Sequence, residues 1–157
     1  MSQARPSKQA RSPGEPRELV FRRRHRLQHD HEYRAVYAHK LRKSRGPLSV
    51  SIRPSPHPQH RLGLSVSKRV GSAVTRGRLK RLIREAFRTL RPELPRPDQA
   101  PGRAGARSYD IIVSPRTAHG ASLGAYTTLL RELIEDAHKE QRRRDARSAR
   151  RSADDAP

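Results

Sequence analysis

Cationic side chains crowd the stretch between Arg61 and Arg91, and the chemistry open to them is the binding of a polyanion. The stretch reads RLGLSVSKRVGSAVTRGRLKRLIREAFRTLR and contains a single acid, Glu85. Guanidinium and ammonium groups replace the counterions of phosphates, and the planar arginine fork can donate two parallel hydrogen bonds to phosphate oxygens. These residue types therefore favour a nucleic-acid backbone as the ligand.

The composition of the whole chain agrees with a nucleic-acid partner. The 157 residues include 36 Lys and Arg against 15 Asp and Glu, which gives a formal net charge of +21. Charge of this size usually serves nucleic-acid binding. A membrane surface is the alternative, but no apolar run approaches the roughly 20 residues that span a bilayer, and the N-terminus lacks the apolar stretch of a secretory signal. The absence of cysteine is typical of a cytosolic protein, so we expect a cytoplasmic location and no membrane partner.

Residues that could catalyse a reaction or hold a metal are poorly placed. The eight histidines, His25 and His29 among them, have no carboxylate or thiolate spaced to complete a zinc site. Asp110, Glu135 and Asp136 do not form the acidic cluster of a two-metal nuclease. The segment GSAVTRGR lacks the spacing and the Lys-Ser/Thr ending of a P-loop. The sequence therefore predicts neither a catalytic residue nor a metal site in the protein.

The chain is expected to contain one folded domain, residues 21–140, between charged segments. Apolar residues make up 32% of the chain, well below the roughly 45–50% of ordinary globular domains. Residues 1–20 are predicted to be a disordered basic arm, and residues 141–157 a disordered charged tail. Residues 92–107 hold four prolines and two glycines and are predicted to form a flexible loop.

The spacing of apolar residues predicts the element order α-β-β-α-β-α, an α+β fold with helices packed on a small mixed sheet. Alternation along the first two strands predicts two faces. The core face is expected to carry Leu48, Val50, Ile52, Leu62, Leu64 and Val66, and the other face Ser51, Arg61, Gly63 and Ser65. The predicted helices cover 30–40, capped by Asp30, then 73–90, and a last one capped by Ser122; the predicted strands cover 48–53, 61–67 and 109–114.

The stretch LSVSKRVGSAVTRGRLKRLIREAFR closely resembles the signature of the protein subunit of bacterial ribonuclease P. Upstream, RLQHDHEYRAVY is similar to the first helix of that family, which carries two aromatic residues four positions apart. The resemblance extends from about Phe21 to Lys139 in the family's element order. It implies the ribonuclease P protein fold, similar to ribosomal S5 domain 2. In that fold a left-handed β-α-β crossover surrounds the basic helix, against the right-handed rule.

The resemblance also implies a function in tRNA processing. Ribonuclease P is an endonuclease that removes the 5′ leader of precursor tRNA by hydrolysing one phosphodiester. Its RNA subunit performs this chemistry with Mg²⁺, while the protein binds that RNA and the leader. We therefore expect the catalytic RNA and precursor tRNA as partners, no cofactor bound by the protein alone, and no catalytic residue in it.

Two groups of site residues follow from matching this chain to the family motifs. One group matches the basic loop and helix that face the catalytic RNA. The other matches a cleft between the first helix and the sheet, where aromatic faces can stack on the unpaired bases of the leader. The expected RNA-binding residues are Lys68, Arg69, Arg76, Arg78, Lys80, Arg81, Arg84 and Arg88, and the expected leader-cleft residues are Tyr33, Tyr37, Ser51, Arg61 and Ser65.

Two positions depart from the family pattern, and simpler interpretations stay open. Gly77 replaces the usual Asn, and a glycine weakens a helix by roughly 1 kcal/mol relative to Ala. Ser51 stands where an aromatic residue is common in the family. Tyr33 and Tyr37 could simply pack in the core, and the charges could form a solvated helix face. A ribosomal-type RNA-binding protein is the main rival function, and a helix-turn-helix DNA binder using 73–90 is the second. The length of the central motif favours ribonuclease P, with no DNA partner.

Overall fold

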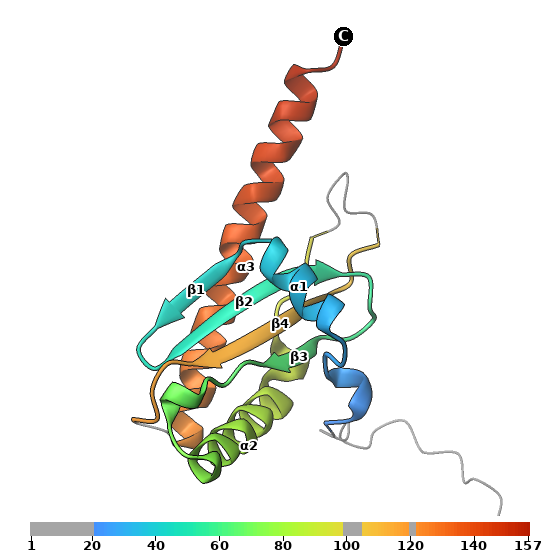
Figure 1. Cartoon of the computed structure of the whole chain (residues 1–157). Helices are drawn as coiled ribbons and strands as arrows, with labels where there is room; N and C mark the ends of the chain where they lie inside the picture. Colours follow the sequence, from blue (N-terminus) through green and yellow to red (C-terminus); the bar gives the residue numbers. More distant parts are fainter. Residues whose placement is uncertain (1–20, 99–104, 120–121) are drawn as a thin grey trace, which may run out of the picture.

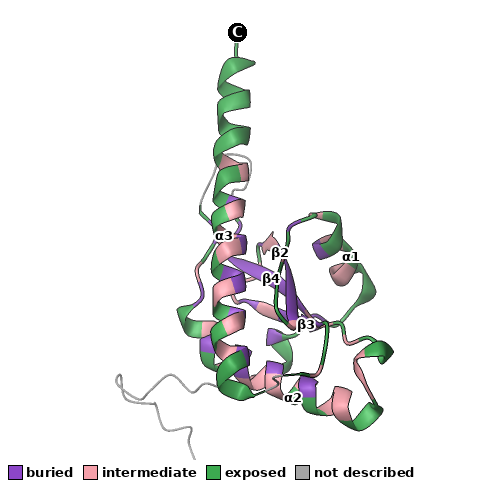
Figure 2. Cartoon of the chain, turned by 90° about the vertical axis from the view of Figure 1, so that its left-hand side faces the viewer, coloured by how far each residue is buried: buried purple, intermediate pink, exposed green. Residues whose placement is uncertain are grey.

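The computed structural model describes residues 21–98, 105–119 and 122–157, which form one sheet covered by helices on both faces (Figure 1). Helix α1 (Asp30–Ala38) covers one face, and α2 (Ala73–Leu90) and α3 (Leu123–Asp154) cover the other. The buried strands lie between these two helical layers (Figure 2). The strands follow the spatial order β1 (Arg42–Arg45), β2 (Leu48–Ser55), β4 (Ser108–Pro115) and β3 (Arg61–Leu64). The described residues also form three short 3-10 helices, η1 (Arg23–His25), η2 (Lys68–Val70) and η3 (Arg91–Glu93).

The sheet is mixed, and its single parallel pair sets the position of α2. Strand β2 is antiparallel to both β1 and β4, whereas β3 runs parallel to β4. In Figure 1, β4 points to the left and lies above β3, with α3 behind the sheet; α2 packs with α3 on that same face of the sheet. This geometry makes the β3-α2-β4 connection a left-handed crossover, the sense that the family resemblance implies, against the usual rule.

Residues along the strands alternate between two faces, as predicted, and the core consists of two unequal parts. The larger part lies between the sheet and helices α2 and α3, and it includes the fully buried Phe87 and Tyr126. The smaller part lies under α1 and consists of Leu27, Val36 and Ile112, with Tyr33 packed against it. The face toward α2 and α3 carries Leu48, Val50, Ile52, Leu62, Ile111 and Val113.

The strand β1 was not predicted, because its residues carry no apolar alternation. Its sequence is RKSR, and it pairs with β2 through a tight turn in which Gly46 takes a φ of 53°, a left-handed conformation that suits glycine. The strand lies at the edge of the sheet, where Lys and Arg discourage pairing with another chain. The observed element order is therefore α-β-β-β-α-β-α, with one strand more than expected.

Some predicted element ends are also corrected. Helix α1 has His29 rather than Asp30 at its N-cap, and it ends at Ala38 instead of residue 40. Strand β2 continues through Pro54, because β1 has ended by then and the proline needs no partner on that side. Strand β3 ends at Leu64, which leaves Val66 half-buried beyond it.

The prediction of a disordered tail from residue 141 is wrong for most of that segment. Helix α3 continues to Asp154 without a break. The segment is rich in strong helix formers, and Glu140 forms ion pairs with Arg143 and Arg144 one turn away. The predicted arm at 1–20 lies outside the described residues, as does 99–104 of the predicted loop. On either side of that gap, Leu94 and Ala106 are buried.

Candidate RNA-binding surfaces

Helix α2 is oriented so that most of its cations point away from the core. Its first turn is capped by Ser72, whose hydroxyl accepts a hydrogen bond from the backbone N–H of Thr75 at 3.2 Å. Its apolar stripe is buried against the sheet and α3. At about 100° per residue, Lys80, Arg84 and Arg88 form a stripe on another side of the helix, with Arg81 beside it. The buried residues of α2 are Leu79, Ile83, Ala86, Phe87 and Leu90.

The eight predicted RNA-binding residues are not equally available. Arg88 is half-buried and paired with Glu85, the only acid of this segment, at 2.6 Å. That carboxylate raises the pKa of Arg88 through hydrogen bonding. Arg78 is exposed on the side of α2 that is nearest Tyr126 of α3. The other six form what we call the basic face, and among the described residues none of them contacts a carboxylate: Lys68, Arg69 and Arg81, which are exposed, and Arg76, Lys80 and Arg84, which are half-buried.

The predicted leader cleft lies on the opposite face of the sheet, where Tyr33 of α1 rests on β3. Its hydroxyl accepts a hydrogen bond from the backbone N–H of Leu64 at 3.2 Å. Gly63 makes this close approach possible, because a Cβ at that position would lie only 2.9 Å from the Tyr33 ring and from Leu27 Cδ1. Tyr33 is thereby held half-buried, with its ring packed on the strand.

The two predicted surfaces meet at a small pocket of about 70 Å³. Arg84 of α2 lines one side of it, and Tyr33 of α1 lines another. Phe21 and Arg26 also line it, and the Arg26 guanidinium lies 4.9 Å from the centre of the Phe21 ring, in a cation–π contact. A cation and aromatic rings are thus placed together where α1 and α2 come closest to the end of β3. The N-terminal pair Phe21 and Arg26 was not predicted as part of this site.

The remaining predicted cleft residues differ in exposure. Tyr37 lies one turn after Tyr33, and 46% of its surface is exposed. Ser51 lies on the same sheet face but is buried, next to Ile112 in the register. Ser65 is exposed just beyond β3, and its backbone N–H donates to the carbonyl of Val113 at 3.1 Å. Of these three, only Tyr37 offers an exposed aromatic ring.

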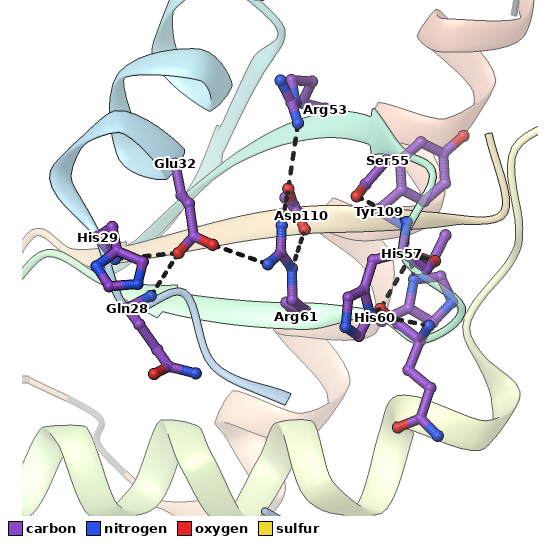
Figure 3. Close-up of polar contacts among 12 residues, drawn as sticks. Gln28, His29, Glu32, Arg53, Ser55, His57, His60, Arg61, Tyr109 and Asp110 are labelled. Carbon is purple, nitrogen blue, oxygen red and sulfur yellow. Dashed lines mark hydrogen bonds and ion pairs between the residues drawn. The ribbon is translucent and has the colours of Figure 1, made fainter. Parts of the chain in front are cut away.

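Arg61 does not lie free in the cleft, because two acids hold it (Figure 3). Its Nε and one terminal nitrogen donate to the two carboxylate oxygens of Asp110, at 2.8 and 2.9 Å. The other terminal nitrogen donates to Glu32 at 2.9 Å. Asp110 is fully buried and also forms an ion pair with Arg53 at 3.5 Å. This acid–arginine network, Glu32, Arg53, Arg61 and Asp110, ties α1 to β2, β3 and β4.

The pKa shifts within the network agree with charged partners. The pKa of Arg61 is raised, chiefly by its hydrogen bonds to Asp110. Burial alone would raise the pKa of Glu32, but hydrogen bonds from the backbone N–H groups of Gln28 and His29 and the charge of Arg61 lower it. All three guanidinium nitrogens of Arg61 therefore donate to acids of the same chain. We assign Arg61 a positioning role in place of the predicted leader contact.

The sequence contains a signal for this network in Asp110. This residue interrupts the apolar run YDIIVS, and an acid in a buried strand needs a cationic partner. Arg53 and Arg61 lie opposite it in the register. In the part of the chain that the structure describes, no group of three or more His, Cys, Asp or Glu could hold a metal ion. No described helix is long and apolar enough to cross a bilayer.

An α+β sheet with a basic helix on one face, most of whose cations contact no acid among the described residues, and with aromatic rings over the other face is typical of nucleic-acid-binding proteins. The family model for Ribonuclease P matches residues 21–138, and the chain belongs to this family. Members of the family are the protein component of an endoribonuclease whose RNA carries out catalysis. The Ribonuclease P protein component of Clostridioides difficile is 35% identical over 100 residues, which cover 64% of this chain and 79% of that one.

Solved structures share the fold. The RNase P protein of Staphylococcus aureus matches with a TM-score of 0.57 and 24% identity, over 72% of this chain and 94% of that chain. The RNase P protein of Thermotoga maritima matches with a TM-score of 0.56 and 24% identity, over 70% of this chain and 96% of that chain. The predicted fold class is therefore confirmed.

Proposed function

We propose that this chain, as the protein subunit of ribonuclease P, binds the catalytic RNA through its basic face and the 5′ leader of precursor tRNA through α1 and β3. The observation that carries the first part is the lack of acids. Lys80 and Arg81 contact no carboxylate among the described residues, while the single acid of the segment, Glu85, is taken by Arg88. Cations left without internal partners on a folded scaffold are suited to replacing phosphate counterions.

The second part is supported by the geometry of Tyr33 and Tyr37. The Tyr33 ring is fixed by its hydrogen bond to β3 and by the contact at Gly63, and the Tyr37 ring is exposed one turn further along α1. Stacking on such rings does not depend on base identity, which suits a leader of variable sequence. Ser51 adds no ring, so stacking relies on the two tyrosines.

Arg61 serves this cleft without contacting the leader. By joining Glu32 of α1 to Asp110 of β4, it sets the distance between the helix and the sheet. Ser65, exposed at the end of β3, can offer its hydroxyl to the leader backbone. Phosphodiester hydrolysis is assigned to the RNA subunit and its Mg²⁺, and we place the assembled enzyme in the cytoplasm.

Reconstitution tests this proposal. Purified protein is mixed with a ribonuclease P RNA and a 5′-extended precursor tRNA, and accurate 5′ cleavage is followed as Mg²⁺ is lowered. We expect the protein to reduce the Mg²⁺ concentration that cleavage needs. A ribosomal-type RNA-binding protein would leave the requirement unchanged, and that outcome would reject the proposal.

A further inference from the structure

The last part of α3 extends beyond the rest of the domain and makes contacts with it only near its start. The match to the family ends at residue 138, but the helix continues to Asp154. At 1.5 Å per residue the segment from Lys139 is about 24 Å long. Its side chains are exposed or half-buried, with the exception of Gln141 (Figure 2). A helix with so little packing needs another reason for its sequence.

Its cations are concentrated on one side. At about 100° per residue, Arg144, Arg147 and Arg151 lie in line, with Arg143 and Arg150 beside them. The opposite side carries mainly alanines and serines, together with Asp145 and with Arg142, which is paired with Asp98 at 2.8 Å. Glu140 pairs with Arg143 at 3.4 Å and with Arg147 at 3.5 Å, while Arg150 and Arg151 contact no acid within the described residues. We name Arg143, Arg147, Arg150 and Arg151 the C-terminal basic stripe.

Arg144, next to the first arginine of the stripe, contacts the end of α1. The two terminal nitrogens of Arg144 donate to the backbone carbonyls of His39 and Lys40, at 2.9 and 2.7 Å. His39 also bonds the side chain of Gln141 at 2.6 Å. Lys40 takes a left-handed φ of 53°, which closes the C-terminus of α1 at this contact. The extension is therefore fixed to the helix that carries both cleft tyrosines.

The stripe and the basic face lie at opposite ends of the molecule. In Figure 1, α2 lies at the bottom, α1 near the middle, and the C-terminal part of α3 projects from the top. A strand that lies along α1 from the pocket at Tyr33 passes Tyr37 next and then arrives at the start of the stripe. The basic face is thus free to contact one RNA while the stripe contacts another part of the assembly.

We propose that the C-terminal basic stripe binds the phosphates of leader nucleotides that extend past Tyr37. This inference rests on the proposed leader-binding function of α1. The stripe has the chemistry for it, because closely spaced arginines repel one another and are relieved by polyanion phosphates, whatever the base sequence. The ligand is the distal part of a long 5′ leader, and the expected gain is affinity that grows with leader length.

The test uses the holoenzyme, assembled from the full chain and a ribonuclease P RNA, with three substrates: mature tRNA, precursor with a short leader, and precursor with a long leader. The variant R143Q/R147Q/R150Q/R151Q removes the charges while keeping residues of similar helix propensity. We expect an affinity decrease of about tenfold for the long leader only, and a salt slope smaller by about 0.7 for each phosphate that the variant no longer binds. The matched variant R143K/R147K/R150K/R151K keeps the charge and should retain most of the affinity.

The outcomes separate the two levels of the proposal. If wild-type holoenzyme does not distinguish precursor from mature tRNA, the leader-binding function itself fails. If it does, but the glutamine variant binds long and short leaders with unchanged or equally reduced affinity, the role of the stripe is rejected. Circular dichroism of the variants verifies that α3 keeps its helicity.

Discussion

The basic face and the acid–arginine network contain the same kind of cation in opposite electrostatic situations. On the basic face, Lys80 and Arg81 have no acid among the described residues within contact. On the other side of the sheet, Arg61 is held by Asp110 and Glu32. Arginine therefore remains available to an external anion in one region and serves as a structural tie in the other. The number of arginines does not distinguish these uses; the neighbouring acids do.

The difference separates two modes of recognition. Binding by the basic face should depend on charge and weaken steeply with salt. Stacking over α1 should depend on the placement of aromatic rings, which the network keeps in position, and should contribute little to the salt slope. Variants that act on only one of the regions can confirm or break this division.

Removing the buried acid should have the largest effect. Asp110→Ala leaves Arg53 and Arg61 without their common partner in a region where Asp110 is fully buried, and breaking such a pair typically costs about 3–5 kcal/mol. The free energy of unfolding, measured with urea, gives the result. The control is Asp136→Ala, which breaks an exposed pair with Arg45 and should cost less than about 1 kcal/mol. Equal losses of unfolding free energy would mean that the buried pairs of Asp110 stabilise the fold no more than the exposed pair of Arg45 and Asp136.

The pH dependence of stability tests whether positive charge also acts on a buried histidine, His60. Burial lowers the pKa of His60 to about 4, and the charge of Arg96 acts in the same direction. The folded protein thus keeps His60 neutral while the unfolded chain takes up a proton below its ordinary pKa near 6.5. Stability should therefore fall as the pH drops from about 6.5 to about 4, by up to about 1.4 kcal/mol per pH unit.

The variant His60→Gln isolates this contribution. Glutamine can still accept the hydrogen bond that the backbone N–H of Tyr109 donates to His60 at 3.0 Å. The pKa values of His25 and His138 are also lowered by burial, but both titrate in the wild type and in the variant. Thermal melts between pH 4 and 7 should give a shallower pH dependence for the variant. Parallel curves would show that His60 is protonated at the same pH in both states.

The two tyrosines should separate stacking from packing. Tyr37 is exposed, so Tyr37→Ala should leave stability nearly unchanged while weakening precursor binding by about 1–3 kcal/mol. Tyr33→Ala removes a ring that packs on Gly63 and Leu27, so it should reduce stability as well. Equilibrium binding of precursor and mature tRNA to the holoenzyme measures the first effect. Equally weakened binding of both RNAs with Tyr37→Ala would contradict stacking on the leader.

The smallest effect concerns a pair of glycines, one in each region. Gly77 lies inside α2, and a Cβ there would meet only the end of the Arg81 side chain, at 3.6 Å. Gly77→Asn should therefore keep activity and raise stability by a few tenths of a kcal/mol. Gly63→Ala is the contrasting variant, because its Cβ would clash with Tyr33 and Leu27. A loss of reconstituted cleavage with Gly77→Asn would indicate that RNA approaches the backbone there.

The sequence predicted the parts of the fold that depend on apolar periodicity. Helix α2 was predicted over its full length, and the two faces of β2 and β3 were assigned correctly. Strand β1 was missed, because RKSR is paired by its turn and its neighbour and has no pattern of its own. The helical tail was missed because its high charge is also typical of disordered tails, although its residues are strong helix formers and Arg144 fixes it to the end of α1.

The candidate site was predictable as a set of residues but not as a set of roles. In the sequence, Arg61 and Lys80 are both cations with no acid close by in the chain. Only the strand register shows that Asp110 lies beside Arg61. Phe21 was placed in the domain but not at the pocket, because no local pattern links it to Arg84. Sequence spacing identifies charged faces, whereas neutralisation depends on which distant acids fold against them.

The most direct test of the division between the two regions is salt-dependent binding by two variants in parallel. Lys80→Ala with Arg81→Ala should lower the salt slope for binding the ribonuclease P RNA by nearly one log-log unit for each phosphate that is no longer neutralised, with the preference for precursor over mature tRNA unchanged. Tyr33→Ala with Tyr37→Ala should reduce the preference for precursor over mature tRNA and leave the salt slope for binding the ribonuclease P RNA unchanged. If both variants change the salt slope and the leader preference together, the two surfaces do not act separately and the account is contradicted.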